Sequence, residues 1–247
     1  MSTATAQTAR PGRRPRYHAP EESSRDLLQN IIRETGRGSA ADTQLDMLRT
    51  GAAREVPIYY AGNPELLRRP AVAIVGAREV SEAGTSRAYK LAKELARAGV
   101  VVVSGLAKGV DTAAHYGSID NGGSTIAVIG TPITKAYPAE NAELQEAIYK
   151  NHLLLSPFAP GEAVFKGNFP KRNRVMALLS DATVIVEASD TSGSLHQAAE
   201  CVRSGRWLFI MKSVVDNPNL TWPQRFLGKP KVAVLSSTDE ILDAIAR

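Results

Sequence analysis

AVAIVGAREVSEAG, residues 71–84, is the stretch that decides the fold. Its first five residues are apolar and predict a buried strand. Gly76 lets the backbone turn sharply after the strand, and Ser81 is placed to cap a helix. A short apolar strand that leads directly into a helix is the repeating unit of a parallel α/β sheet. The segment therefore predicts the first strand–turn–helix unit of such a sheet.

The same alternation continues along the sequence. Nearly continuous apolar runs are typical of strands buried on both faces, and the helices between them predict right-handed crossovers. The expected strands are 71–75, 100–103, 125–129, 152–155, 182–186, 207–211 and 231–235, with helices near 82–98, 110–120, 140–150, 171–180, 194–204 and 237–246. We therefore expect an α/β fold over residues 59–247, an extended Rossmann-like, mostly parallel and doubly wound sheet.

The part before this sheet predicts a short helical extension, residues 23–58, preceded by a disordered tail, residues 1–22. Ser24 can cap a first helix, and Asp42 can begin a second. The apolar residues of the first helix share one face at helical spacing; they are Leu27, Leu28, Ile31 and Ile32. The tail is rich in Pro, Arg, Ser, Thr and Ala and has little apolar periodicity.

The positive charge is concentrated in the tail. Four arginines and no acidic residue lie in residues 1–20, which leaves about +1 of the net charge of +5 for the rest of the chain. These arginines are Arg10, Arg13, Arg14 and Arg16. They are either a solvated charge run or a basic arm that touches DNA phosphates. A DNA site in the folded part must then be a local basic patch.

Composition limits the other classes of protein. Apolar residues make up 43% of the sequence, which is sufficient for a core. A single cysteine, Cys201, excludes a disulfide within the chain and a cysteine-based zinc site, and the four histidines are scattered, so no metal is expected. No apolar run approaches the roughly 18–20 residues that span a membrane, and the N-terminus lacks the apolar stretch of a signal peptide. We expect a soluble, cytoplasmic protein.

The loops that follow the first two expected strands contain residues suited to binding phosphate. In open α/β sheets, ligands bind outside the carboxyl ends of the strands. Arg78 follows Gly76 there, and the 104–109 loop holds two glycines, a serine and a lysine. Neither loop has the G-x-G-x-x-G or G-x-x-x-x-G-K-[ST] pattern, so no dinucleotide or ATP cofactor is expected. Asp111 would stabilise the next helix start, and His115, one turn later, could pair with it.

The strongest signal is the segment 166–174, KGNFPKRNR, with four cations and no acid. Pro170 suits the first turn of a helix, and the cations around it oppose the helix dipole, which a bound polyanion would explain. Phe169 could stack on a base; the alternative is a solvated charge run around a buried Phe. Residues 192–194, Ser-Gly-Ser, form another helix start suited to phosphate or to simple capping. The strand order 3-2-1-4-5-6, if adopted, would bring Arg78 to this segment.

The candidate DNA- and phosphate-binding residues are therefore Gly76, Arg78, Ser104, Gly105, Lys108, Gly109, Lys166, Asn168, Phe169, Lys171, Arg172, Asn173, Arg174, Ser192, Gly193 and Ser194.

Six segments, taken in order, resemble the DprA/Smf family of DNA-processing proteins. They are YYAGNPELL (59–67), AVAIVGAR (71–78), VVSGLAKGVDTAAH (102–115), TIAVIGTPITKAYPAEN (125–141), NFPKRNRVMALLS (168–180) and VIVEASDTSGSL (184–195). The resemblance implies an extended Rossmann fold, a homodimer, binding of single-stranded DNA without sequence specificity, and delivery of that DNA to a RecA-type recombinase. It implies no catalytic residue. His196 and Gln197 depart from the family pattern, as does segment 212–230.

Two other functions stay open. A phosphoribohydrolase or nucleotide sensor of the lysine-decarboxylase-like group would use Glu187 and Asp190 as carboxylates on a glycosidic bond, although its Pro-Gly-Gly-x-Gly-Thr loop is missing. An adaptor without a ligand would use Leu27, Ile31 and segment 212–230 as a protein-binding surface.

Overall fold

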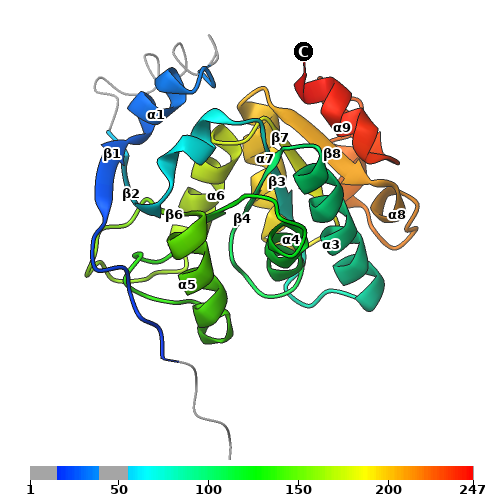
Figure 1. Ribbon diagram of the computed structural model, residues 1–247. Helices are drawn as coiled ribbons and strands as arrows, with labels where there is room; N and C mark the ends of the chain where they lie inside the picture. Colours follow the sequence, from blue (N-terminus) through cyan, green and yellow to red (C-terminus); the bar gives the residue numbers. More distant parts are fainter. Residues whose placement is uncertain (1–15, 39–54, 247) are drawn as a thin grey trace, which may run out of the picture.

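The computed structural model of the protein describes residues 16–38 and 55–246, and it forms a sheet of nine strands flanked by helices (Figure 1). The strands are β1 (Ser24–Leu27), β2 (Pro57–Gly62), β3 (Ala71–Val75), β4 (Val101–Ser104), β5 (Thr125–Val128), β6 (Leu153–Ser156), β7 (Ala182–Ile185), β8 (Trp207–Met211) and β9 (Val232–Leu235). The helices are α1 (Leu28–Glu34), α3 (Glu82–Arg97), α4 (Val110–Ile119), α5 (Ala142–Asn151), α6 (Asn168–Leu178), α7 (Ser194–Arg203), α8 (Lys212–Val215) and α9 (Thr238–Ile245), with 3-10 turns η1 (Pro64–Arg68), η2 (Ala139–Asn141) and η3 (Trp222–Arg225).

The strand order is β1-β2-β6-β5-β4-β3-β7-β8-β9. All seven strands expected from the sequence are present, and they pair in parallel from β6 to β9. The expected order 3-2-1-4-5-6 is wrong, because the fourth expected strand, β6, lies beside β5 on the far side of the sheet. The strand beside β3 is instead β7, so the order of the sheet reverses between these two strands.

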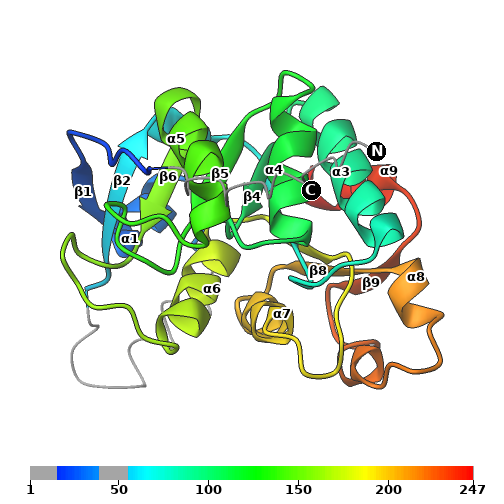
Figure 2. The ribbon, with the colours of Figure 1, turned by 90° about the horizontal axis from the view of Figure 1, so that it is seen from below.

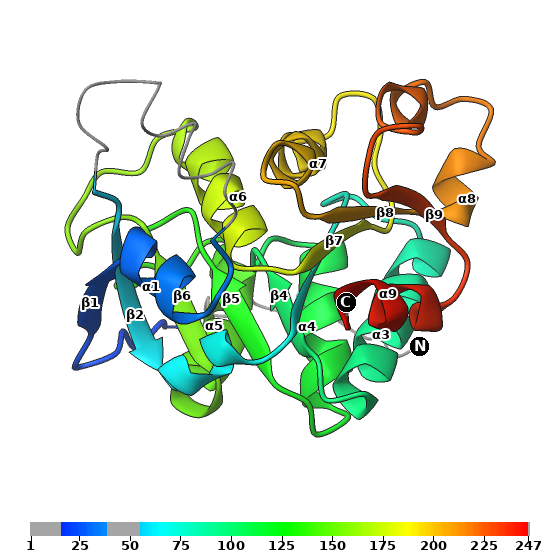
Figure 3. The same cartoon turned by 90° about the horizontal axis from the view of Figure 1, so that it is seen from above.

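Helices cover both faces of the sheet, as a doubly wound fold requires (Figures 2 and 3). Alternate residues of β3 explain this arrangement: Ala71, Ala73 and Val75 pack with α1, α6 and α7, whereas Val72 and Ile74 pack with α3, α4 and α9. Every residue of β3 is therefore buried, which is why its sequence is apolar throughout. Among the described residues, no helix is long and apolar enough to cross a membrane.

The segment before the Rossmann-like sheet is helical only in part. Ser24, the expected helix cap, lies in β1 and pairs with Tyr60 of β2, and α1 begins at Leu28. β1 and β2 extend the sheet in antiparallel fashion beyond β6. β1 is an edge strand without apolar alternation, so its sequence carries little strand signal. The second helix expected at Asp42 lies outside the described residues, as do residues 1–15 of the expected disordered tail.

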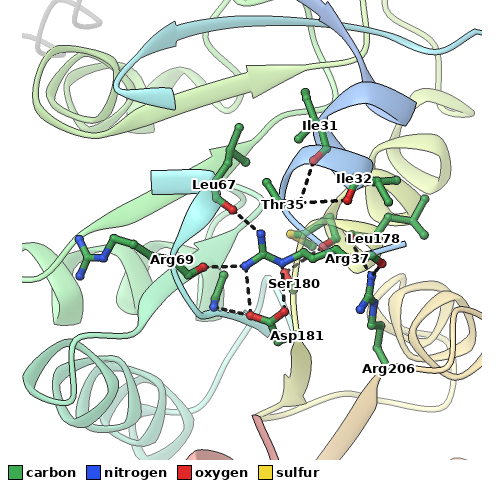
Figure 4. Close-up of polar contacts among 12 residues, drawn as sticks. Ile31, Ile32, Thr35, Arg37, Leu67, Arg69, Leu178, Ser180, Asp181 and Arg206 are labelled. Carbon is green, nitrogen blue, oxygen red and sulfur yellow. Dashed lines mark hydrogen bonds and ion pairs between the residues drawn. The ribbon is translucent and has the colours of Figure 1, made fainter. Parts of the chain in front are cut away.

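A buried arginine ties this extension to the amino end of the sheet (Figure 4). The Arg37 side chain is only 5% exposed, and its guanidinium forms a two-pronged ion pair with Asp181, with N–O distances of 3.0 and 3.1 Å. It also donates to the backbone carbonyls of Leu67 and Arg69. Asp181 in turn accepts a hydrogen bond from the Ala71 amide at the start of β3. One cluster therefore joins the extension, β3 and the residue that precedes β7.

Candidate nucleic-acid interface

A cavity of about 1010 Å³ opens at the carboxyl ends of β3 and β7. Its walls are the loop after β3, the first turns of α6 and α7, the loop after β7 and residues around α8. These are the two strands between which the strand order reverses, the position at which open α/β sheets bind their ligands. Figure 3 shows α6 and α7 side by side on one face of the sheet.

The predicted convergence of Arg78 with the 166–174 segment is confirmed, although by another route through the sheet. α6 lies in the crossover from β6 to β7, which passes from one side of β3 to the other. The guanidinium carbon of Arg78 lies 5.4 Å from the centroid of the Phe169 ring. The ring of Tyr137, which the sequence did not single out, lies 5.6 Å from the same ring. A cation and two aromatic rings thus meet beside the cavity.

Phe169 is held by close packing rather than left in open solvent. A Cβ atom at Gly130 would lie 2.7 Å from its ring, so only a glycine allows this approach. A smaller pocket adjoins the main cavity here and is lined by Arg78, Lys108, Tyr137 and Phe169 among others. The Phe169 ring therefore has a fixed position with Arg78 against it, which is the arrangement that a base-stacking platform needs.

Arg172 lies deeper, beneath the cavity. Its side chain is 5% exposed, and one amino group donates to the Val128 carbonyl at 2.7 Å. Within residues 16–38 and 55–246, its buried Nε has no hydrogen-bond partner. A Cβ atom at Gly105 would lie 1.7 Å from this guanidinium, so Gly105 makes room for the arginine. Burial lowers the pKa of Arg172, Asp111 opposes that shift, and Arg78 adds to it. The site thus contains a buried cation with an unused donor.

Hydrogen bonds to buried neighbouring groups hold the 104–109 loop in place. The Ser104 hydroxyl is fully buried and donates to the Ile74 carbonyl at 2.7 Å. The Asp111 carboxylate accepts from the amides of Gly105 and Ala107, the groups that seemed suited to phosphate. Gly109 adopts a positive φ of 78°, and a Cβ there would lie 2.4 Å from the Ala77 carbonyl oxygen. These contacts show how the loop is supported against the β3 loop.

The expected pairing of His115 with Asp111 is wrong. The Nδ1 atom of His115 lies 2.7 Å from the Thr125 hydroxyl, which itself donates to the Val102 carbonyl. Nδ1 therefore carries the proton and donates to Thr125, which leaves the buried Nε2 without a partner. Burial, with smaller contributions from His152 and Arg172, lowers the pKa of His115 to about 3. This histidine is a neutral core residue at ordinary pH.

Several of the candidate cations are exposed. Arg78, Lys166, Lys171 and Arg174 are all exposed, as is Lys108, whose ammonium lies 2.7 Å from the Glu140 carboxylate. In contrast, Asn168 and Asn173 of the same helix are buried. The side-chain amide of Asn173 donates to the Gly193 carbonyl at 3.4 Å, and the buried side-chain nitrogen of Asn168, Nδ2, has no hydrogen-bond partner among the described residues.

The start of α7 forms the opposite wall. The hydroxyls of Ser192 and Ser194 lie 2.6 Å apart, and Gly193 between them is exposed. The preceding loop is fixed by Asp190, whose carboxylate accepts from the Thr221 amide and hydroxyl and from the Trp222 amide. Segment 212–230 therefore buttresses this wall of the cavity, a role its sequence did not indicate.

Four charged residues that line the cavity were not predicted as binding residues: Glu79, Arg87, Asp111 and Glu187. Glu187, at the end of β7, accepts from the amide and hydroxyl of Ser81 and lies 3.4 Å from Arg87. Ser81 caps α3 as expected, through the Gly84 amide. Because Ser81 follows the first strand and Glu187 the fifth, only knowledge of the strand order could have brought them together.

These contacts bear on the hydrolase alternative. Glu187 and Asp190 both have several hydrogen-bond donors around them, so neither is a carboxylate held ready for proton transfer. The pKa of Asp190 is lowered, chiefly by Thr221. In the part of the chain that the structure describes, no three His, Cys, Asp or Glu side chains come together as a metal site. The geometry therefore does not favour glycosidic-bond cleavage.

Comparison with known proteins gives a consistent result. Residues 46–246 match the family model of DNA recombination-mediator protein A. DNA processing protein DprA of Streptococcus pneumoniae is 44% identical over 162 residues, which are 65% of this chain and 57% of that protein. DprA of Bacillus subtilis is 35% identical over 168 residues, 68% of this chain and 57% of that protein. The chain spans about half the length of the curated relatives it matches.

Solved structures agree. The X-ray structure of DprA from S. pneumoniae superimposes with a TM-score of 0.70 at 37% identity, covering 76% of this chain and 65% of that one. DprA from Helicobacter pylori, described for its single-stranded DNA binding mode, gives a TM-score of 0.70 at 26% identity, covering 90% of this chain and 95% of that one. The six segments that resemble DprA/Smf, the sheet and the family match all coincide: the chain belongs to the DNA recombination-mediator protein A family.

Proposed function

We propose that the protein binds single-stranded DNA in the cavity between β3 and β7, without catalysing a reaction on it. The observation that carries this proposal is the convergence of Arg78, Phe169 and the cationic start of α6 on one cavity. A base would stack on Phe169, while phosphates would lie against Arg78, Lys166 and Lys171. The solved H. pylori relative, which binds single-stranded DNA, supports the same assignment.

Electrostatics favour an anionic ligand over an empty cavity. Cations in the first turn of α6 oppose the positive end of the helix dipole, and the buried Arg172 has an unused Nε donor below them. Both features are unfavourable in the free protein and become favourable when a polyanion lies against them. A continuous backbone of phosphates suits several cations spread along one wall better than a single small anion does.

The test is binding of labelled oligo-dT, followed by fluorescence anisotropy at several salt concentrations with a duplex control. Lys166→Glu combined with Lys171→Glu should abolish tight binding and reduce the slope of log affinity against log salt by roughly 1.4, about 0.7 for each phosphate contact. Both lysines are exposed, so the fold should survive. Lys90→Glu, on the exposed face of α3, is the matched control. Unchanged affinity in the double variant would refute the proposal.

We infer further that the protein acts in the cytoplasm as a homodimer that delivers single-stranded DNA to a RecA-type recombinase during recombination, natural transformation included. This inference rests on the family, whose name describes a recombination mediator. Light scattering of the purified chain should give twice the mass of 26.5 kDa. Addition of the protein should also accelerate loading of a RecA-type recombinase on DNA coated with single-strand-binding protein; a monomer or an absence of acceleration would reject the corresponding part.

A further inference from the structure

Phe165 is unusually exposed for a large apolar side chain. It is 65% exposed, the largest value among the exposed large hydrophobic residues of the described chain. Its neighbour Lys166 is exposed as well. A phenylalanine ring in water forgoes the free energy that burial would supply, so a ligand that covered it would gain that free energy.

The backbone fixes where Phe165 stands relative to α6. Its carbonyl oxygen accepts a hydrogen bond of 3.0 Å from the backbone amide of Asn168, the first residue of α6. Gly167 already has helical angles, φ −66° and ψ −12°. Phe165 therefore lies four residues before Phe169, in the turn that leads into α6.

The surroundings of Phe165 favour a nucleobase over a protein surface. A protein-binding patch consists of several contiguous apolar side chains. Here the exposed charged residues that follow it in the sequence are cations: Lys166, Lys171 and Arg174. From residue 163 to residue 180 the sequence contains no acidic residue. A single aromatic face set among cations has the composition with which proteins hold a base and its flanking phosphates.

We propose that Phe165 is a second base-stacking platform, which holds the nucleotide next to the one stacked on Phe169. This inference rests on the proposed function and adds the exit path of the strand, past Phe165 and Lys166 and away from the sheet. It also assigns the loop before α6 a direct role in binding.

The test compares Phe165→Ala with the native protein on oligo-dT and on an abasic strand of the same length. We expect Phe165→Ala to weaken oligo-dT binding roughly 5- to 150-fold, the usual effect of removing one stacking ring. The salt dependence should stay unchanged, because no charge is removed. Phe165→Trp should restore the affinity. The abasic strand should bind the native and Phe165→Ala proteins equally, because it offers no base to the ring.

The control is Tyr116→Ala, which removes another exposed ring, 43% exposed, from α4. It should leave the affinity unchanged. Full affinity of Phe165→Ala for oligo-dT, or an equal loss on the abasic strand, would overturn the stacking role while leaving the proposed function intact. Absence of binding by the native protein would instead reject the proposed function, and this inference with it.

Discussion

Two arginines, each 5% exposed, lie at opposite ends of the same sheet, and their surroundings differ. Arg37 at the amino end has a carboxylate partner, Asp181, and two backbone carbonyls. Arg172 at the carboxyl end donates to Val128 and interacts electrostatically with Asp111, but its Nε has no hydrogen-bond partner among the described residues. Burying a charge is costly unless the protein supplies its partners. A buried charge whose partners come from the protein serves the fold, whereas one left short of partners indicates a site for a ligand.

The largest expected effect on stability is at the amino end of the sheet, where Arg37 has its carboxylate partner. Arg37→Ala should lower the free energy of unfolding by about 3–5 kcal/mol, because it leaves a partly buried Asp181 carboxylate without its cation. Urea unfolding measures this, with Lys90→Ala on the surface as control, expected to change stability by less than about 0.5 kcal/mol. DNA affinity of the folded variant should not change. A loss of affinity without a loss of stability would reverse the roles assigned to the two ends.

At the carboxyl end of the sheet, Arg172→Met should weaken DNA binding more than it lowers stability, the opposite of what Arg37→Ala should do. Arg172 forms no direct ion pair among the described residues, but it interacts electrostatically with the buried Asp111 carboxylate, so its removal should lower the stability by less than Arg37→Ala does. Affinity for oligo-dT should fall by roughly 1.5–3 kcal/mol, the contribution of a hydrogen bond to a charged group. Anisotropy titration and urea unfolding of the same preparation separate the two effects. A strongly destabilised variant with full affinity would show that Arg172 is structural.

The buried His115 of α4 should give the stability a pH dependence. His115 has a folded-state pKa of about 3, below its ordinary value of 6.5, so between these values only the unfolded chain takes up the proton. Stability should therefore fall as the pH falls through this window, by up to about 1.4 kcal/mol per pH unit. Burial raises the pKa of Asp111, whose contribution has the opposite sign. His115→Gln should flatten the slope of stability against pH; an unchanged slope would assign it to other groups.

The smallest effect concerns Lys108. Its ammonium faces Glu140 in an exposed ion pair, and such pairs contribute roughly 0–1 kcal/mol. Glu140→Gln should scarcely alter stability, but it should raise DNA affinity a few-fold at low salt, because a carboxylate that repels phosphate is removed. The gain should disappear at high salt. A loss of affinity would mean that Glu140 orients Lys108 toward the DNA.

The sequence predicts the parallel strands and the cavity wall well, because both depend on local signals. Apolar runs such as 71–75 and the cationic segment 166–174 need no knowledge of distant residues. Contacts between residues that are far apart in the sequence could not be predicted in this way. The position of β6, the Ser81–Glu187 contact and the Thr125 partner of His115 depend on strand order, which no local pattern encodes. Gly105 was predicted to bind phosphate, because the sequence alone does not distinguish a phosphate-binding glycine from one that makes room for an arginine side chain.

The pairing of β3 with β7 has a consequence for synthesis on the ribosome. Ala71 and Asp181, hydrogen-bonded at the start of these strands, are 110 residues apart in the chain. At the usual rate of translation, roughly 5–20 s pass between the emergence of the first strand and that of its second neighbour. During this interval AVAIV is an open, wholly apolar edge, the kind of strand that recruits the wrong partner. We therefore expect nascent chains that end before β7 to associate with chaperones, and to be released once β7 has paired with β3 and the cavity is complete.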